Sequence, residues 1–138
     1  MNAGIYFLLL RLPRPVTIML RGAPYRLPRG FYVYTGSAQR NLAQRIARHL
    51  RRHKKLHWHI DHLLQHATIT AVCYLPDASR DDEVRCAELW AAAADFVPVP
   101  KFGASDSPAR AHLAGFRTRR TITSHSLWRT ARPWQAGS

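Results

Sequence analysis

Short runs of hydrophobic residues, separated by proline and glycine, predict a series of strands. Residues 4–11 carry Ile, Tyr, Phe and Leu and stop before Pro13, which cannot donate a backbone hydrogen bond to a sheet. Residues 16–20 form a second run, and residues 31–36 are rich in the aromatic and β-branched types that favour strands. We expect these three runs to form an antiparallel meander, with residues 68–75 as a further strand.

Three segments have the features of helices. Residues 41–52 open with Asn41 and Gln44, which are spaced for a capping box, in which two side chains satisfy free backbone N–H groups at a helix start. Residues 58–65 predict a short second helix, and the acids that begin residues 81–94 suit the positive end of a third helix. The apolar positions expected to face the sheet are Leu42, Ala43, Ile46, Ala47 and Leu50 in the first helix, Trp58, Ile60, Leu63 and Leu64 in the second, and Leu89 with the alanines in the third.

The pattern weakens toward the C-terminus. Residues 102–106 are typical of an ordered turn, and from residue 117 onward Arg, Thr and Ser dominate without a helical or strand period. We therefore expect one α+β domain over residues 1–116, a small antiparallel sheet flanked by about three helices, followed by a basic, flexible tail at 117–138. A chain of 138 residues can bury a core without disulfides or metals.

Charge is distributed unevenly along the chain. The 21 Lys and Arg residues outnumber the 8 Asp and Glu residues and give a net charge of +13. Residues 1–60 hold 12 basic groups and no acid, whereas residues 61–106 hold all 8 acids. A positive field of this kind favours polyanions through counterion release, so nucleic acid is the expected partner. A basic surface kept only for solubility is the alternative.

The cysteines and the longest apolar run limit the class of protein. Cys73 falls in an expected strand and Cys86 in an expected helix, which indicates two buried thiols rather than a disulfide. The run from Ile5 to Leu10 is too short to span a bilayer and lacks the flanks of a secretory signal. We therefore expect a cytoplasmic protein without a membrane segment.

Two short motifs make the sequence more specific. Gly4-Ile5-Tyr6 begins the first expected strand, Tyr34-Thr35-Gly36 ends a later one, and the helix that follows carries Arg45 and His49. This order resembles the signature of the GIY-YIG nuclease family. The resemblance implies a small antiparallel sheet flanked by helices, two signature tyrosines side by side on it, and an Arg and a Glu contributed by the following helices.

A longer set of motifs resembles one uncharacterised branch of that family. The set adds His57-Trp58-His59-Ile60-Asp61, residues 102–106 and His112-Leu113. The branch occurs alone or fused to an endonuclease III-like glycosylase, so the resemblance implies a DNA repair protein as a further partner.

The chain departs from the family pattern in three places. Thr35 replaces the central Ile of the second motif, and Ser107-Pro108-Ala109 stands where the branch commonly has Cys-x-Cys. The two tyrosines lie 28 positions apart, farther than is usual in the family, so we expect residues 13–30 to be an inserted hairpin arm.

The residue types fit phosphodiester hydrolysis, which needs a base for the attacking water and positive charge near the transition state. Arg45 and His49 are four residues apart and share one helix face, so they can face Tyr6 and Tyr34. A guanidinium clamps phosphate oxygens in a forked geometry, and a neutral His can take the proton of a tyrosine.

The resemblance further implies one carboxylate and one divalent cation. We assign Glu88 as the ligand of Mg²⁺ or Mn²⁺, hard cations that prefer oxygen, with Glu83 as the alternative. The leading hypothesis is a metal-dependent endonuclease that acts on nucleic acid, preferably DNA. The alternatives are a non-catalytic nucleic-acid-binding module of the same fold and an interaction protein that docks on a DNA repair enzyme.

Basic residues near the expected site predict a track for the nucleic-acid backbone, with a solvated helix face as the alternative. The track consists of Arg48, Arg51, Arg52, Lys54 and Lys55. The histidines that follow, His57, His59, His62 and His66, have spacings found in zinc sites. Because only Asp61 could add a carboxylate there, we favour phosphate contacts or packing over zinc.

Overall fold

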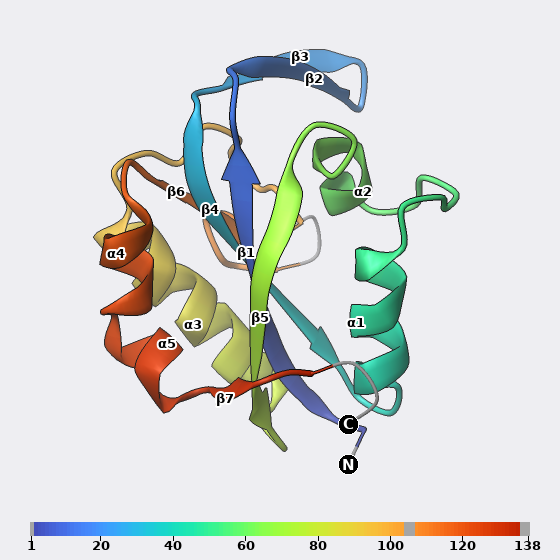
Figure 1. The fold of residues 1–138 in the computed structure, drawn as a ribbon. Coiled ribbons are helices and arrows are strands. Elements are labelled where there is room, and N and C mark those ends of the chain that lie inside the picture. The colour runs from blue at the N-terminus through green and yellow to red at the C-terminus, as the bar shows by residue number, and fades with distance from the viewer. Residues whose placement is uncertain (1, 104–106, 136–138) are drawn as a thin grey trace.

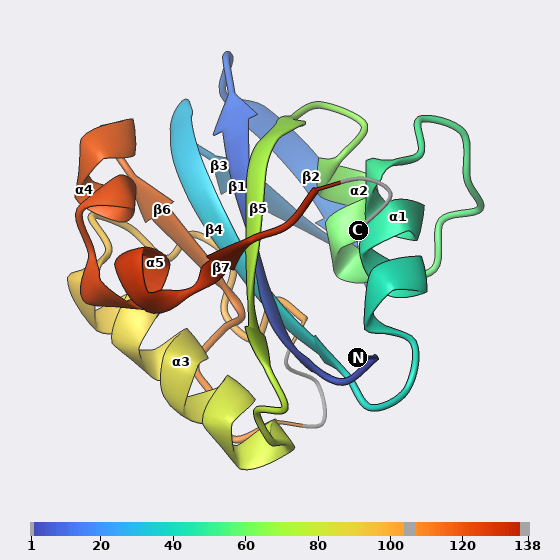
Figure 2. The ribbon, with the colours of Figure 1, turned by 60° about the horizontal axis from the view of Figure 1, so that its bottom comes forward.

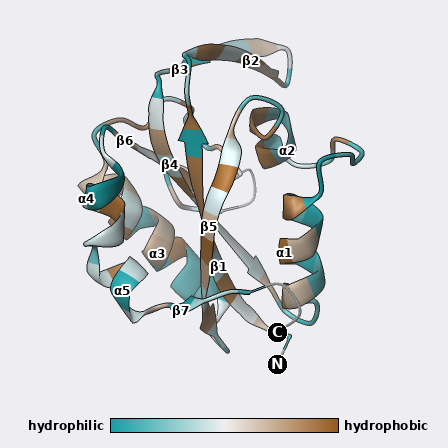
Figure 3. Ribbon diagram, in the orientation of Figure 1, coloured by the Kyte–Doolittle hydropathy of each residue, from teal (hydrophilic) through white to brown (hydrophobic). Residues whose placement is uncertain are grey.

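A five-stranded antiparallel sheet forms the centre of the computed structural model, which describes residues 2–103 and 107–135 (Figure 1). Its strand order is β6-β4-β1-β5-β7. The strands are β1 Gly4–Leu12, β4 Gly30–Ala38, β5 Thr68–Pro76, β6 Leu113–Phe116 and β7 Arg132–Pro133. The central strand β1 pairs with β4 on one side and β5 on the other, and it is hydrophobic over much of its length (Figure 3). The α+β class and the antiparallel sheet are confirmed.

The inserted arm is a separate hairpin. Strands β2 (Val16–Leu20) and β3 (Ala23–Leu27) pair only with each other, so the predicted meander of the first three runs is wrong. A two-residue turn closes the hairpin, with Arg21 at φ 52° and Gly22 at φ 77°. Because both residues are left-handed, the turn folds β3 directly back onto β2 and leaves β4 to pair with β1.

Helices α1 (Leu42–Leu50) and α2 (His59–Leu63) cover one face of the sheet (Figure 2). Asn41 makes no side-chain capping bond, so the predicted capping box is wrong. The backbone N–H of Leu42 donates instead to the carbonyl of Asn2 at 2.8 Å. The buried face of α1 is Leu42, Ile46 and His49, whereas Ala47 is exposed and Leu50 is 40% exposed.

Helices α3 (Arg80–Ala93), α4 (Arg119–Thr123) and α5 (Ser126–Thr130) cover the opposite face. Ser79 caps α3 and exchanges hydrogen bonds with Asp82. The inward positions of α3 are Glu83, Cys86, Ala87, Trp90 and Ala91, at helical spacing. Leu89 falls outside that stripe and is 47% exposed, so its predicted packing on the sheet is wrong.

The segment after residue 116 is folded, contrary to the predicted flexible tail. Ile122 is fully buried against the α3 face of the sheet, and Leu127 and Trp128 pack on the same core. Strand β7 then pairs with the edge of β5, where Cys73 lies opposite Pro133. Helices of five residues are too short to show a sequence period, which explains the error. Residues 136–138 of the tail lie outside the described residues, as do 104–106 of the predicted turn.

Two further expectations can be compared with the structure. Cys73 and Cys86 are free and buried, as predicted. Within residues 2–103 and 107–135, no helix has both the length and the hydrophobicity needed to cross a bilayer.

Candidate functional site

The two signature tyrosines lie side by side. Tyr6 on β1 and Tyr34 on β4 point to the α1 face of the sheet, with ring centroids 6.3 Å apart. Tyr6 is paired in register with Gly36, where a Cβ would stand 2.4 Å from the Tyr6 Oη. The glycine of the second motif is therefore required by the space that the Tyr6 side chain occupies.

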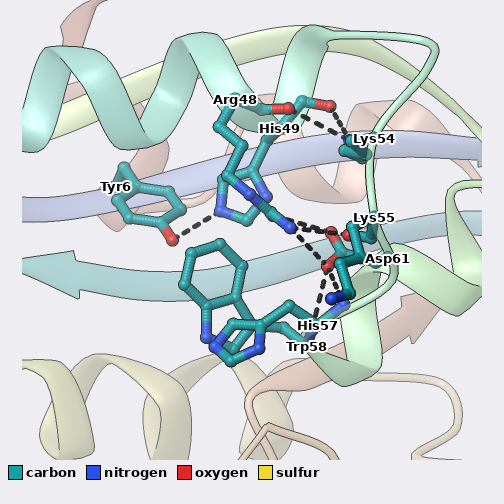
Figure 4. A network of polar contacts seen from close by, with 8 residues as sticks. All are labelled: Tyr6, Arg48, His49, Lys54, Lys55, His57, Trp58 and Asp61. Atoms are coloured by element: carbon teal, nitrogen blue, oxygen red, sulfur yellow. Dashed lines mark hydrogen bonds and ion pairs between the residues drawn. The ribbon is translucent and has the colours of Figure 1, made fainter.

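His49, on α1, packs against the two tyrosines and contacts the Tyr6 hydroxyl. The Tyr6 Oη lies 2.7 Å from His49 Nε2, and each residue is 2% exposed (Figure 4). Burial, reinforced by the positive charge of Lys54, lowers the pKa of His49 to about 4. Burial and the neighbouring Tyr34 raise the pKa of Tyr6 well above its ordinary value. At neutral pH the Tyr6 hydroxyl therefore donates its hydrogen bond to an uncharged imidazole.

Arg45 lies beside the tyrosines in a shared cleft. Its Nη1 donates to the carbonyl of Ser37 at 2.7 Å, and its guanidinium carbon is 5.3 Å from the ring centroid of Trp58. The cleft is lined by Tyr6, Tyr34 and Arg45, together with backbone and side chains of residues 36–41. Arg45 and His49 both lie beside the two neighbouring tyrosines, as predicted, but only Arg45 lines the cleft; His49 lines a separate groove.

Glu83, and not Glu88, lies in this cleft. Glu83 Oε1 accepts from Ser37 Oγ at 2.7 Å, and its Oε2 lies 3.2 Å from His112 Nδ1. Burial opposes its ionisation, but the hydrogen bonds from His112 and Ser37 outweigh that effect and keep the pKa of the carboxyl low. Glu83 is therefore a carboxylate held near the C-terminal end of β4.

Glu88 faces away from the cleft and binds Arg110, whose backbone N–H and Nε donate to its two oxygens at 2.7 and 3.2 Å. Five helical residues turn a side chain by about 140°, so Glu83 and Glu88 cannot share one face of α3. The placement of Glu88 in the site is wrong for this reason.

The segment from His57 to Asp61 supports the site by joining α1 to α2. Asp61 is 1% exposed and accepts two hydrogen bonds from the Arg48 guanidinium, at 3.1 and 3.2 Å. It also accepts from the backbone N–H groups of His57 and Trp58 at the start of α2. Burial raises the cost of its charge, yet these donors together keep the pKa of Asp61 below its usual value. Asp61 thereby fastens α1 to α2.

Trp58 fills the space between that ion pair and the tyrosines. Its ring lies 4.3 Å from the Arg48 guanidinium carbon and 5.4 Å from the His49 ring. The Trp58 ring therefore contacts Arg45, Arg48 and His49 and holds their side chains in place. Sequence reasoning did not find the role of this segment. The signal for it is Asp61, which stands three residues after Trp58, the residue that precedes α2.

Comparison with known proteins gives a family for the chain. Residues 5–131 match the family described as Domain of unknown function DUF123. The chain belongs to this family. No curated protein and no solved structure matches it. The match extends over α4 and α5 of this DUF123 chain, in agreement with their packing on the sheet.

The five basic residues predicted as one track have different surroundings in the DUF123 fold. Arg48 is held by Asp61 and by the Lys55 carbonyl, and Lys54 Nζ donates to the carbonyls of Arg48 and His49 at the end of α1. Arg51 and Arg52 are exposed and line a separate groove that contains neither tyrosine.

Lys55 is also exposed, but it is not part of that groove. Of the five residues, Arg51, Arg52 and Lys54 line that groove, whereas Arg48 and Lys55 do not. The cleft has instead two further arginines that sequence reasoning did not assign to the site, Arg40 and Arg80. Nothing in their local spacing distinguished them from other exposed arginines.

The histidines do not gather into a metal site. Among residues 2–103 and 107–135, no three His, Cys, Asp or Glu side chains are placed to hold one ion. The Nδ1 of His59 accepts from the backbone N–H of Gly103 at 2.9 Å, and His57 packs edge-on against Trp58. A backbone hydrogen bond holds His59, and a ring contact with Trp58 holds His57.

Proposed function

We propose that this chain is a metal-dependent endonuclease that hydrolyses phosphodiester bonds in nucleic acid, preferably DNA. The observation that carries the proposal is the Tyr6–His49 hydrogen bond at the wall of a cleft that also contains Arg45 and Glu83. A hydroxyl with a proton acceptor, a guanidinium and a carboxylate are the groups that phosphodiester hydrolysis uses.

The sequence resemblance supports the same reaction. Gly4-Ile5-Tyr6 and Tyr34-Thr35-Gly36 resemble the signature of GIY-YIG nucleases, and the tyrosines of the two motifs are neighbours on the sheet. The net charge of +13 is suited to a polyanionic substrate.

Each side chain has a task in the proposed reaction. Tyr6 orients the attacking water through its hydroxyl, and His49 Nε2 accepts the phenolic proton as the water is deprotonated. Arg45 favours the phenolate of Tyr6 by its positive charge and can turn a free N–H edge toward a phosphate oxygen. Tyr34 restricts the position of the phosphate on the other side of the cleft.

Glu83 fits Mg²⁺ or Mn²⁺. Each of its oxygens has one hydrogen-bond partner and so retains a lone pair, and Mg²⁺ is commonly held by one or two carboxylates together with water and substrate phosphate. A divalent cation bound there would supply positive charge to the phosphate and the leaving oxygen.

The test is incubation of the pure protein with plasmid, single-stranded DNA and RNA, with Mg²⁺, with Mn²⁺ and with a chelator. We expect metal-dependent strand cleavage. In Glu83→Gln the rate should fall by about 10²-fold or more with nearly unchanged binding, because the cation acts on charge that develops in the transition state. Glu88→Gln is the matched control on the same helix and should cleave like the native protein. Cleavage that is unaffected by Glu83→Gln would overturn the assignment.

One observation favours a second function, a nucleic-acid-binding module without catalysis. Both oxygens of Glu83 already have hydrogen-bond partners, and Arg45 Nη1 is bonded to the Ser37 carbonyl. A cleft closed by these bonds would bind phosphate through Arg40 and Arg80 without positioning a cation. Salt-sensitive binding without cleavage of any of the three substrates would identify this function.

A further inference from the structure

A second recess adjoins the cleft. Its walls include Arg21, Tyr34, His57, Trp58, His59 and Arg80. Tyr34, Trp58 and Arg80 line both hollows, and Glu83 lies at their junction. A nucleotide whose phosphate lies in the cleft would therefore have its base at the recess.

The two hollows differ in the groups that they offer. Residues 36–41 and Arg45 line much of the cleft. The recess has more rings, those of Tyr34, His57, Trp58, His59 and His112, beside the carboxylates of Asp81 and Glu83. Tyrosine, tryptophan and imidazole rings are the surfaces on which unpaired bases stack in proteins that bind single strands. A base within a duplex has neighbours on both faces, so it cannot enter a recess without leaving the stack.

Arg21 gives the recess its outer cation, from an unusual backbone position. It occupies the tip of the β2–β3 arm with φ 52°, in the left-handed region where Gly or Asn is unstrained. The two-residue turn requires this positive φ, and it places Arg21 at the tip of the arm whatever its side chain does. The arm thereby brings the Arg21 side chain to the lining of the recess, which also includes Arg80.

We propose that this recess holds an unpaired nucleobase and that the protein consequently prefers single-stranded nucleic acid over a duplex. Arg21 stacks on that base or contacts its neighbouring phosphate, as a planar guanidinium can. The inference rests on the proposed function of the cleft as a phosphate site, and it assigns the inserted arm a part in substrate selection.

Measuring nucleic-acid binding in the absence of metal tests the proposed preference for unpaired bases. The probes are a fluorescein-labelled single-stranded DNA, the blunt duplex of the same sequence, and the same single strand with a run of abasic positions, each measured by fluorescence anisotropy in a chelator at fixed salt. We expect the intact single strand to bind about fivefold or more tightly than either other probe, because the abasic strand keeps its phosphates and the duplex keeps its bases stacked. Equal affinity for the intact and abasic strands would overturn the proposal.

Two variants of the arm make the test specific. Arg21→Gly removes the side chain and relieves the backbone, so the hairpin should fold, and the preference for the intact single strand should fall by about fivefold. Arg26→Ala is the control, since Arg26 is exposed on β3 and lies outside the recess. An unchanged preference in Arg21→Gly would also overturn the proposal.

The outcomes separate this inference from the proposed function. A single-strand preference without metal-dependent cleavage supports the recess and removes the nuclease assignment. Metal-dependent cleavage with equal affinity for intact and abasic strands removes the recess and leaves the nuclease assignment in place.

Discussion

At the scale of single residues, burial sets the chemistry of the site. Tyr6 and His49 are almost without solvent contact, so each is held in its uncharged form. Both pKa shifts favour the uncharged pair over phenolate and imidazolium, so the proposed proton transfer from Tyr6 to His49 must accompany deprotonation of the water. The same burial links the proton affinity of His49 to the stability of the fold.

The first prediction at this scale concerns pH. The pKa of His49 is about 4 in the fold and 6.5 in an exposed chain, so between these values the unfolded state binds a proton that the native state does not. The free energy of unfolding should therefore decrease as pH falls from 6.5 toward 4, with His49 contributing at most about 1.4 kcal/mol per pH unit. Urea unfolding at several pH values measures this slope.

The variant His49→Gln isolates that contribution. Gln can still accept from the Tyr6 hydroxyl but does not titrate, so its stability should vary less with pH over this range. His59 and His125, whose pKa values burial also lowers, remain in both proteins and act equally. Parallel pH profiles for the two proteins would contradict the role of His49.

At the scale of elements, one buried ion pair aligns two helices. Asp61 joins the start of α2 to Arg48 on α1, and Trp58 packs between them and His49. Both catalytic candidates of α1 therefore depend on the segment from His57 to Asp61, of which Trp58 also lines the cleft.

Asp61→Asn tests this dependence. Removing one partner leaves the Arg48 guanidinium, which is largely buried, without its counter-charge, so the free energy of unfolding should fall by about 3–5 kcal/mol. Asp77→Asn is the control, because Asp77 is exposed at φ 59°, where Asn is equally tolerated, and it should change stability by less than about 0.5 kcal/mol. Chemical denaturation measures both, and similar losses in the two variants would contradict the proposed role of Asp61.

The C-terminal helices provide a second test at this scale. Ile122 on α4 is fully buried, so Ile122→Ala should cost about 2–4 kcal/mol through lost burial and a cavity. Arg119→Ala, an exposed position on the same helix, should be nearly neutral. Thermal unfolding compares the two, and a neutral Ile122→Ala would mean that residues beyond 116 do not belong to the core.

At the scale of the whole molecule, the acids differ in how far they offset the basic surface around the cleft, and Asp81 is exposed in the wall of the adjoining recess. Asp61 and Glu83 are buried and hydrogen-bonded, and Glu88 is paired with Arg110. The arginines of the cleft and of the groove at Arg51 and Arg52 come from the chain before residue 61 and from the start of α3. In the cleft, Arg40, Arg45 and Arg80 outnumber the one carboxylate, Glu83, which favours a polyanion there.

Salt dependence of binding measures that charge. If Arg40, Arg45 and Arg80 each contact a phosphate, log K should fall with log salt at a slope of about −2 for a single strand, a loss of roughly twentyfold between 50 and 200 mM. Arg40→Ala should reduce the slope by about 0.7, whereas Arg120→Ala on α4 should leave it unchanged. Affinity that stays constant over this range would contradict electrostatic binding.

Much of the fold could be predicted because the local pattern of hydrophobic and polar residues indicates the strands and helices. The strand runs at residues 4–11, 31–36 and 68–75 became β1, β4 and β5, and the helices near 41–52 and 81–94 became α1 and α3. Tyr6, Tyr34, Arg45 and His49 could also be predicted together, since strand alternation and four-residue helical spacing fix which side chains share a face. By itself the sequence thus determined the class of fold and the grouping of Tyr6, Tyr34, Arg45 and His49.

The tertiary structure decided what local pattern cannot express. Glu83 and Glu88 lie on the same helix, and only the docking of α3 against β4 selects Glu83. Arg48 is a basic residue like Arg51 in sequence, and only the folding of α2 beside α1 turns it toward a buried carboxylate. The short helices after residue 116 are held by contacts with the sheet rather than by their own period. In each case the deciding energy comes from groups distant in the chain, because burial and pairing of charge depend on what the fold brings alongside.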